Sequence, residues 1–205
     1  MRGYIVTGTD TDVGKTVFAA GLAGHIGAAY WKPVQAGIEG GTDCQRVAAL
    51  AGGRARILPE VHVLRTPCSP HEAARRDGVV IAADRLALPA VDDPLVVEGA
   101  GGVLVPFAQN LLAADLFARW GLPVILVART TLGTINHSLL SLEALRARGI
   151  AVHGVAFSGE PNPASEDAIT LFGAVRHLGR LPRLDPLDAR SLSAAFSAHI
   201  RTEAL

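Results

Sequence analysis

The sequence predicts an α/β fold, a mostly parallel sheet flanked by helices in three α/β/α layers, as a single domain over residues 1–205. Apolar, β-branched runs alternate with stretches of helical periodicity, which is typical of strand–helix–strand units. Strand candidates such as Pro123–Ala128 are apolar without alternation, as in strands covered on both faces. A glycine-rich loop follows the first strand candidate and opens a helix, which is the context of a phosphate-binding loop.

The same patterns give the expected elements in chain order. The predicted strands are Tyr4–Thr7, Ala29–Lys32, Leu95–Glu98, Pro123–Ala128 and Val152–Phe157. The predicted helices are Gly14–Ile26, Asp43–Ala51, Leu111–Arg119, Ile135–Arg148, Ala164–His177 and Ala189–Ile200. Because ligands of open parallel sheets bind beyond the carboxyl ends of the strands, candidate functional residues are sought at those ends.

Composition excludes several classes of protein. Hydrophobic residues make up 49% of the 205 residues, which excludes a disordered chain. Lys+Arg and Asp+Glu both number 19, so a broad basic surface for nucleic acid or an anionic membrane is not expected. The N-terminus lacks the pattern of a signal peptide, no apolar run reaches membrane-helix length, and the two cysteines lack metal spacing. We expect a cytoplasmic protein.

The loop after the first strand is Gly8-Thr9-Asp10-Thr11-Asp12-Val13-Gly14-Lys15-Thr16. It has five residues, rather than the usual four, between its first glycine and Gly-Lys-Thr. Its N–H groups and the helix start would face phosphate, Lys15 would reach the β- and γ-phosphates, and Thr16 would bind Mg²⁺. Asp10 is interpreted as an acidic residue favoured by the helix N-terminus. For Asp12, that interpretation and a role in orienting an amine-bearing substrate are equally supported.

Two acidic residues are candidate partners of Thr16 at a magnesium site. Glu98 ends an apolar strand and is followed by Gly99-Ala100-Gly101-Gly102, a turn that a ligand can approach closely. Asp43 lies at a predicted helix start, where N-terminal capping alone would explain it. Asp43 therefore becomes a metal-ligand candidate only together with the other residues.

Two further segments are candidates for binding a second substrate. Only Lys15 and Lys32 are lysines among the 19 basic residues, and Lys32 opens Lys32-Pro33-Val34-Gln35-Ala36-Gly37 at the same sheet edge. The helix start in Leu132-Gly133-Thr134-Ile135-Asn136-His137 offers free N–H groups to a carboxylate, although capping by Thr134 explains it too. No Ser, Cys or acidic partner accompanies His137, so we interpret it as a core residue or one that supports the site rather than as a catalytic base.

These four segments together resemble dethiobiotin synthetase, whose phosphate-binding loop has the same five-residue gap. The resemblance spans most of the first 140 residues and is weak in the last third. It implies a P-loop NTPase-like fold and ATP-dependent ring closure in biotin biosynthesis. The implied substrates are 7,8-diaminononanoate, CO₂ and ATP with Mg²⁺, and the implied products are dethiobiotin, ADP and phosphate. It also implies a homodimer with active sites at the subunit interface.

The resemblance also implies a role for each matching residue. Catalysis would use Lys32, Lys15 and Thr11, and the metal would be held by Thr16, Asp43 and Glu98. The nucleotide would contact Asp12, Val13, Gly14, Lys15, Thr16, Val17, Asp43, Glu98, Gly99, Ala100, Gly101, Ser158, Gly159, Leu181, Pro182 and Arg183. The amine substrate would contact Thr11, Lys15, Lys32, Ala36, Gly37 and Gly102, and its carboxylate would meet Thr134, Ile135 and Asn136 of the partner subunit.

Three positions depart from the family pattern. Ala36 stands where the family often has a serine, and Asp12 where it often has glutamate. The stretch Phe157-Ser158-Gly159-Glu160 stands where an Asn-Asp pair often reads the adenine. We hypothesise that base discrimination is weakened, so that other nucleoside triphosphates would serve.

The main alternative is a switch ATPase of the partitioning or metal-insertion type acting on a protein partner. Such proteins typically carry a second lysine early in the loop, where this chain has Thr9, Asp10 and Thr11. Larger ligases of related chemistry usually need an additional domain. A non-catalytic nucleotide-binding subunit would not need Lys15, Thr16, Asp43 and Glu98 together.

Overall fold

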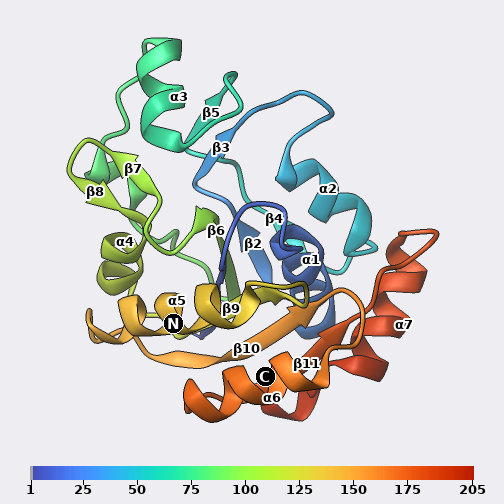
Figure 1. Cartoon of the computed structure of the whole chain (residues 1–205). Helices are drawn as coiled ribbons and strands as arrows, with labels where there is room; N and C mark the ends of the chain where they lie inside the picture. The colour runs from blue at the N-terminus through green and yellow to red at the C-terminus, as the bar shows by residue number, and fades with distance from the viewer. Residues whose placement is uncertain (1) are drawn as a thin grey trace.

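The computed structural model describes residues 2–205, and its centre is a seven-stranded sheet in the order β11-β10-β9-β1-β6-β2-β4 (Figure 1). Every strand pair in this sheet is parallel, so all the strands present their carboxyl ends at one edge. The strands are β1 (Gly3–Gly8), β2 (Ala29–Trp31), β4 (Arg56–Ile57), β6 (Leu95–Gly102), β9 (Val124–Arg129), β10 (Val152–Ser158) and β11 (His177–Leu181).

Helices cover both faces of the sheet because successive strand residues point to opposite sides. Val6, Tyr30 and Val96 pack with α1 (Lys15–Ile26), α2 (Asp43–Leu50) and α7 (Ala189–His199). Their chain neighbours Ile5, Trp31 and Val97 belong to the opposite core, with α4 (Ala113–Trp120), α5 (Thr134–Arg146) and α6 (Pro163–Phe172). Figure 1 shows α2 and α7 on one side of the sheet and α4 on the other. The predicted three-layer fold class is confirmed.

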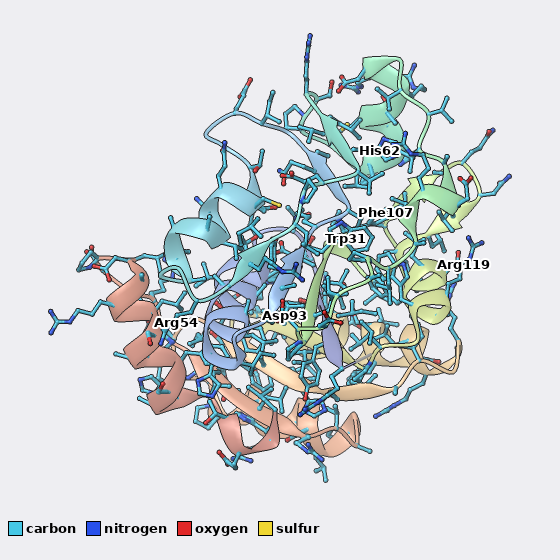
Figure 2. All side chains as sticks on the ribbon, turned by 180° about the vertical axis from the view of Figure 1, so that it is seen from behind. Trp31, Arg54, His62, Asp93, Phe107 and Arg119 are labelled. Atoms are coloured by element: carbon cyan, nitrogen blue, oxygen red, sulfur yellow. The ribbon has the colours of Figure 1, made fainter. Side chains whose placement is uncertain are left out.

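Small elements are added at one end of the sheet, near the top of Figure 1. The parallel pair β3 (Val34–Ala36) and β5 (His62–Leu64) carries α3 (Pro70–Asp77), and the antiparallel pair β7 (Pro106–Ala108) and β8 (Leu111–Leu112) lies nearby. The 3-10 turns η1 (Ala83–Leu86) and η2 (Thr202–Ala204) complete the chain. In Figure 2, Trp31 and Phe107 lie among closely packed side chains, in agreement with their exposed fractions of 3% and 0%. Arg119 lies at the outer edge and is exposed to solvent.

Two predicted helices differ from the structure. The prediction Leu111–Arg119 is wrong at its start, because Leu111 and Leu112 form β8 and the helix begins at Ala113. The prediction Ala164–His177 is wrong at its end, because α6 stops at Phe172 and His177 already begins β11. The chain reverses at Ala174, which has a φ of 41°, and then pairs with β10.

The predicted strand Leu95–Glu98 ends too early, because β6 continues for four more residues to Gly102. The remaining predicted strands and helices begin and end within two residues of the observed ones. Helix α1 begins at Lys15, because Gly14 is its N-cap rather than its first turn. Among residues 2–205, no helix has the length and apolar character needed to cross a membrane.

Candidate active site

A cavity of about 1230 Å³ lies at the carboxyl edge of the sheet, where the sequence predicts the ligand site. Its walls come from the loop after β1, the start of α1, the segment between Lys32 and Arg46, the stretch from Pro67 to Pro70, and the end of β6. The predicted site residues that line it are Thr11, Asp12, Gly14, Lys15, Thr16, Val17, Lys32, Ala36, Gly37, Asp43, Glu98, Ala100 and Gly101.

The loop after β1 has the backbone that an anion site requires. Gly14 has a φ of 97°, and a Cβ there would lie 2.6 Å from the Ser158 hydroxyl oxygen, so only glycine fits. The Asp12 backbone is also left-handed, with a φ of 56°. With Gly14 as the N-cap and no side-chain cap, the first N–H groups of α1 are left for a ligand.

Lys15 closes over this loop. Its Nζ donates a hydrogen bond to the Asp10 carbonyl oxygen at 2.7 Å. Burial is the main cause that lowers the pKa of the Lys15 ammonium to about 8, and the charge of Lys32 acts in the same direction. The Asp10 carboxylate caps the turn by accepting from the Thr11 N–H at 2.8 Å and lies 3.5 Å from Arg129, away from the cavity centre. Within residues 2–205, Lys15 forms no salt bridge with a carboxylate, which leaves its charge available to a phosphate.

Three oxygen-bearing side chains converge beside Lys15. The Thr16 hydroxyl oxygen lies 2.9 Å from Glu98 Oε1 and 3.1 Å from Asp43 Oδ1. Carboxylate and hydroxyl oxygens are the donors that Mg²⁺ prefers, and this ion usually completes its shell with waters and substrate phosphates. Among residues 2–205, no group of three or more His, Cys, Asp or Glu side chains forms a metal cage. The donor set fits Mg²⁺ held jointly by protein and nucleotide.

The Lys32 ammonium lies between the two carboxylates. Its Nζ is 2.5 Å from Asp43 Oδ2 and 3.0 Å from Glu98 Oε1, and the residue is 5% exposed. Burial opposes the charge of Lys32, but Glu98 and Asp43 outweigh it and raise its pKa above the ordinary value. Burial likewise opposes the charge of Asp43, whose pKa is nevertheless lowered by Lys32. The lysine is therefore a charged counter-ion of the carboxylates.

Asp43 is not the cap of its helix. Thr42 is the N-cap, and it exchanges hydrogen bonds with Gln45 at 3.3 and 2.9 Å. The Asp43 N–H donates to Gln35 Oε1 at 3.1 Å, and Gln35 Nε2 donates to the Gly37 carbonyl at 2.9 Å. This network leaves the Asp43 carboxylate free for Thr16 and Lys32, so the capping interpretation of Asp43 is wrong.

The glycine segment after Glu98 is strand rather than turn, since β6 continues to Gly102. Ala100 and Gly101 line the cavity, and Gly102 lines a second hollow of about 390 Å³. Gly99 packs closely on Phe117, because a Cβ there would lie 2.9 Å from that ring. Val13 is 3% exposed and belongs to the core on the α1 face, so only its backbone is available to a ligand.

The predicted base-binding residues lie beside the phosphate-binding loop but do not line the cavity. Ser158 pairs with Leu181 at the carboxyl ends of β10 and β11, and Gly159 N–H donates to the Leu181 carbonyl at 3.0 Å. Pro182 and Arg183 follow Leu181 directly. Because the Ser158 side chain lies against Gly14, the ends of β10 and β11 are next to the phosphate-binding loop.

The start of α5 lies outside the cavity of its own chain. Gly133 is the N-cap, with a φ of 91°, and no side chain caps the helix. Thr134 is 1% exposed and donates its hydroxyl to the Arg129 carbonyl at 2.5 Å, so it ties the helix to β9 rather than capping it. Ile135 and Asn136 are exposed. His137 is exposed too and lines the second hollow, which excludes a core position for it.

Sequence reasoning missed three groups that shape the site. Tyr30 donates its hydroxyl to Glu98 Oε2 at 2.8 Å, and Gln35 positions the Asp43 backbone. The stretch from Pro67 to Pro70 forms a wall. The available signal for Tyr30 was its place two residues before Lys32 on the same strand face.

The comparisons with known proteins agree with this geometry. A family model described as AAA domain matches residues 2–191. The chain is 60% identical to the ATP-dependent dethiobiotin synthetase BioD of Rhodopseudomonas palustris (strain BisB18), over 97% of the chain and 96% of that protein. It is 59% identical to the protein of the same name from Novosphingobium aromaticivorans, over 99% and 98%.

Solved structures resemble the fold at low sequence identity. The septum site-determining protein MinD of Pyrococcus horikoshii OT3, complexed with Mg-ADP, has a TM-score of 0.59 at 17% identity, covering 95% of this chain and 86% of that one. A ParA family ATPase from Chlorobium tepidum TLS has a TM-score of 0.58 at 9% identity, covering 97% and 93%. These likenesses concern the fold alone, whereas the family model and the close relatives cover nearly the whole sequence. The chain belongs to the AAA domain family and to the ATP-dependent dethiobiotin synthetase BioD family.

Proposed function

We propose that this chain closes the ureido ring of dethiobiotin from 7,8-diaminononanoate, CO₂ and ATP, releasing ADP and phosphate. The observation that carries the proposal is one cavity that combines a phosphate-binding helix start, two lysines and a hydroxyl–carboxylate set fit for Mg²⁺. The close relatives are named for this activity. A protein nucleophile is not required, because the substrate supplies both attacking amines.

The first step is carbamate formation. A neutral substrate amine attacks the carbon of CO₂ and loses a proton, which leaves an N-carboxylate with one negative charge. Free alkylamines titrate near pH 10, so the amine must be deprotonated in the site. Lys15 and Lys32 bring positive charge into the cavity, which lowers the pKa of a neighbouring amine and stabilises the carbamate anion. Thr11, Ala36, Gly37 and Gly102 are the proposed contacts of the diamine.

The second step activates the carbamate. A carbamate oxygen attacks the γ-phosphorus, ADP leaves, and a carbamic-phosphoric anhydride forms. Lys15 and the N–H groups at the start of α1 hold the phosphates in line and neutralise charge. When bound on Thr16, Asp43 and Glu98, Mg²⁺ supplies further charge neutralisation on the phosphate oxygens. The second amine then attacks the carbamoyl carbon, phosphate leaves and the ring closes.

We propose that the nucleotide base lies along Ser158, Gly159, Leu181, Pro182 and Arg183. Ser158 and Leu181 end β10 and β11, the other three residues follow them directly, and Ser158 lies next to Gly14. Ser158 and Gly159 provide fewer side-chain groups for reading a base than an Asn-Asp pair would. Weak discrimination among ATP, GTP and CTP follows from this, and a strict requirement for ATP would contradict it.

We also propose a homodimer in which the α5 start of one subunit completes the site of the other. Thr134, Ile135 and Asn136 do not line the cavity of their own chain. The second hollow shares Thr11 and Val105 with the cavity, and its rim carries Leu104 and Leu140, which are 50% and 57% exposed. A second copy seated there would cover these leucines. It would also bring free helix N–H groups to the substrate carboxylate.

The test is phosphate release from MgATP with 7,8-diaminononanoate and bicarbonate, each omitted in turn. We expect release to require all of them and the product to have the mass of dethiobiotin. Lys32→Ala should abolish product formation. Release that is indifferent to the diamine would discard the substrate assignment and favour a switch ATPase. Repeating the assay with GTP and CTP tests the base site.

A further inference from the structure

Tyr30 is a fully buried tyrosine whose hydroxyl reaches the metal-site carboxylate. It lies in β2, and its ring packs in the apolar core on the α1 face together with Val6 and Val96. Its hydroxyl donates a hydrogen bond of 2.8 Å to Glu98 Oε2. The strand register explains the contact, because Tyr30 pairs with Val96 and Glu98 lies two residues further along the same face of β6.

The two oxygens of Glu98 are used differently. Oε1 faces the cavity, where it accepts from the Thr16 hydroxyl at 2.9 Å and from Lys32 Nζ at 3.0 Å. Oε2 faces the core, where it accepts from Tyr30. Glu98 is 1% exposed, so water has little access to Oε2. The tyrosine hydroxyl therefore fixes which oxygen turns toward the cavity.

We propose that Tyr30 is a positioning residue that holds Glu98 in the orientation that binds the metal ion. This inference rests on the proposed role of Glu98 as a magnesium ligand. A carboxylate on a flexible side chain can rotate about its bonds, and a hydrogen bond to its second oxygen restricts that rotation. Outer partners of metal ligands typically account for about 10–100-fold in metal affinity.

A purely structural role is the competing explanation. A buried tyrosine hydroxyl needs a hydrogen-bond partner, and Glu98 would serve even if no metal were ever bound. The two explanations differ in what the loss of the hydroxyl changes. A structural role predicts a change in thermal stability with unchanged metal affinity, whereas a positioning role predicts weaker metal binding.

The experiment measures the dissociation constant of Mn²⁺, as a spectroscopic substitute for Mg²⁺, on the protein saturated with ADP. Free Mn²⁺ is followed by electron paramagnetic resonance in wild type, Tyr30→Phe, Tyr4→Phe and Glu98→Gln. Tyr4 is a matched control, because it also pairs with Val96, from the β1 side, and its ring lies against His153. Phenylalanine keeps the ring and its packing, and circular dichroism with thermal unfolding verifies the fold of each variant.

We expect Tyr30→Phe to weaken Mn²⁺ binding by about 10-fold or more and Tyr4→Phe to leave it unchanged. ADP affinity in the presence of EDTA should be equal in wild type and Tyr30→Phe. The inference is overturned if Tyr30→Phe binds Mn²⁺ within about twofold of wild type while Glu98→Gln binds it weakly. If Glu98→Gln also binds Mn²⁺ normally, the proposed metal site itself is wrong, and the role of Tyr30 with it.

Discussion

The two lysines of this chain share one cavity but have different electrostatic surroundings. Lys15 donates to the Asp10 carbonyl, and burial lowers its pKa to about 8 although the nearby carboxylates of Glu98, Asp12 and Asp43 act in the opposite direction. Lys32 is paired with Asp43 and Glu98, which raise its pKa. Without a nucleotide, the charge of Lys32 stabilises the fold and the charge of Lys15 opposes it.

Replacement of Lys32 should therefore destabilise the protein. Lys32→Met leaves two carboxylates close together, and removing one partner of a buried ion pair costs about 3 kcal/mol or more. For a chain of this size, that corresponds to a fall in Tm of roughly 10 °C. Millimolar Mg²⁺ should restore part of the loss, because a cation could then occupy the place of the ammonium. Thermal unfolding with and without Mg²⁺ measures both effects.

Lys15→Met is the matched control for this prediction. It removes a lysine from the same cavity, but from one that contacts a backbone carbonyl rather than a carboxylate. Its Tm should equal or exceed that of wild type, because a desolvated charge is removed, while nucleotide affinity should fall. Equal losses of Tm in the two variants would show that the pairing of Lys32 does not stabilise the fold.

For single residues, the sequence could predict a functional role where a residue type is rare in the composition. The scarcity of lysine singled out Lys32, and its contacts with Asp43 and Glu98 are what a compact ammonium can make. For Tyr30 the sequence offered only its spacing from Lys32, and for Gln35 it offered nothing, because their contacts depend on strand register and on the path of the chain after β2. Register is a tertiary property that the local pattern does not encode.

At the scale of elements, one hydrogen-bonded junction holds the cavity wall formed by Pro67, Cys68, Ser69 and Pro70. Asp77, the last residue of α3, accepts hydrogen bonds from the Arg65 N–H, the Thr66 N–H at 3.3 Å and the Thr66 hydroxyl at 2.7 Å. These bonds tie the end of α3 to the residues that follow β5. The hydrogen bond from the Thr66 hydroxyl is the main cause that lowers the pKa of Asp77 below its ordinary value.

Asp77→Asn should lower Tm at pH 7 and loosen the wall. The amide oxygen can still accept from the two N–H groups, and the amide N–H₂ can donate to the Thr66 hydroxyl, but these neutral bonds are weaker than the charge-assisted bonds of the carboxylate. Because the folded-state pKa is lowered, the carboxylate stabilises the fold above about pH 4, and this is lost as the pH falls further. The Tm difference between wild type and variant should therefore be present at pH 7 and shrink progressively as the pH falls below about 4. Hydrogen exchange of residues 65–70 reports the loosening, and a Tm difference that is independent of pH would contradict the prediction.

Among the strands, the sequence could predict those at the centre of the sheet but not the short ones at its margins. The central strands β1, β6, β9 and β10 are apolar on both faces, so their runs stand out without tertiary information. Strand β11 was missed because it is short, carries His177 and Arg180, and follows α6 after a tight reversal at Ala174. Strands β7 and β8 have only three and two residues, and they depend on pairing with each other.

For the whole molecule, the fold alone does not distinguish a synthetase from a switch ATPase. The MinD and ParA structures share the fold at 17% and 9% identity. One fold can host many activities, so the function has to be argued from the site. In this chain the site adds Lys32 and its carboxylate partners to the phosphate-binding loop. The sequence prediction of the family, made from four segments, is confirmed by relatives matched over nearly the whole chain.

The proposed dimer predicts that two inactive or impaired variants can restore activity when their subunits exchange. If each site combines the cavity of one subunit with the α5 start of the other, a Lys32 variant alters the part from the first subunit. An Asn136 variant alters the part from the second subunit. Asn136→Asp puts a negative charge beside the substrate carboxylate on an exposed position, so it should raise the KM for the diamine without unfolding the protein. Lys32→Ala should abolish turnover. Mixed and allowed to exchange subunits, the two variants form heterodimers in which one of the two sites is intact.

Random exchange of equal amounts makes about half of the dimers heterodimers, so about a quarter of all sites should regain wild-type behaviour. At a diamine concentration far below the raised KM, this appears as activity well above the sum of the separate variants. Lys32→Ala mixed with Glu98→Gln is the control, because both changes fall in the same half of the site and exchange restores nothing. Activity equal to the sum in both mixtures would mean that Asn136 serves the cavity of its own chain or none, and the shared site would have to be abandoned. Recovery in the first mixture alone would require a site built from two copies, since exchange repairs only what lies on different subunits.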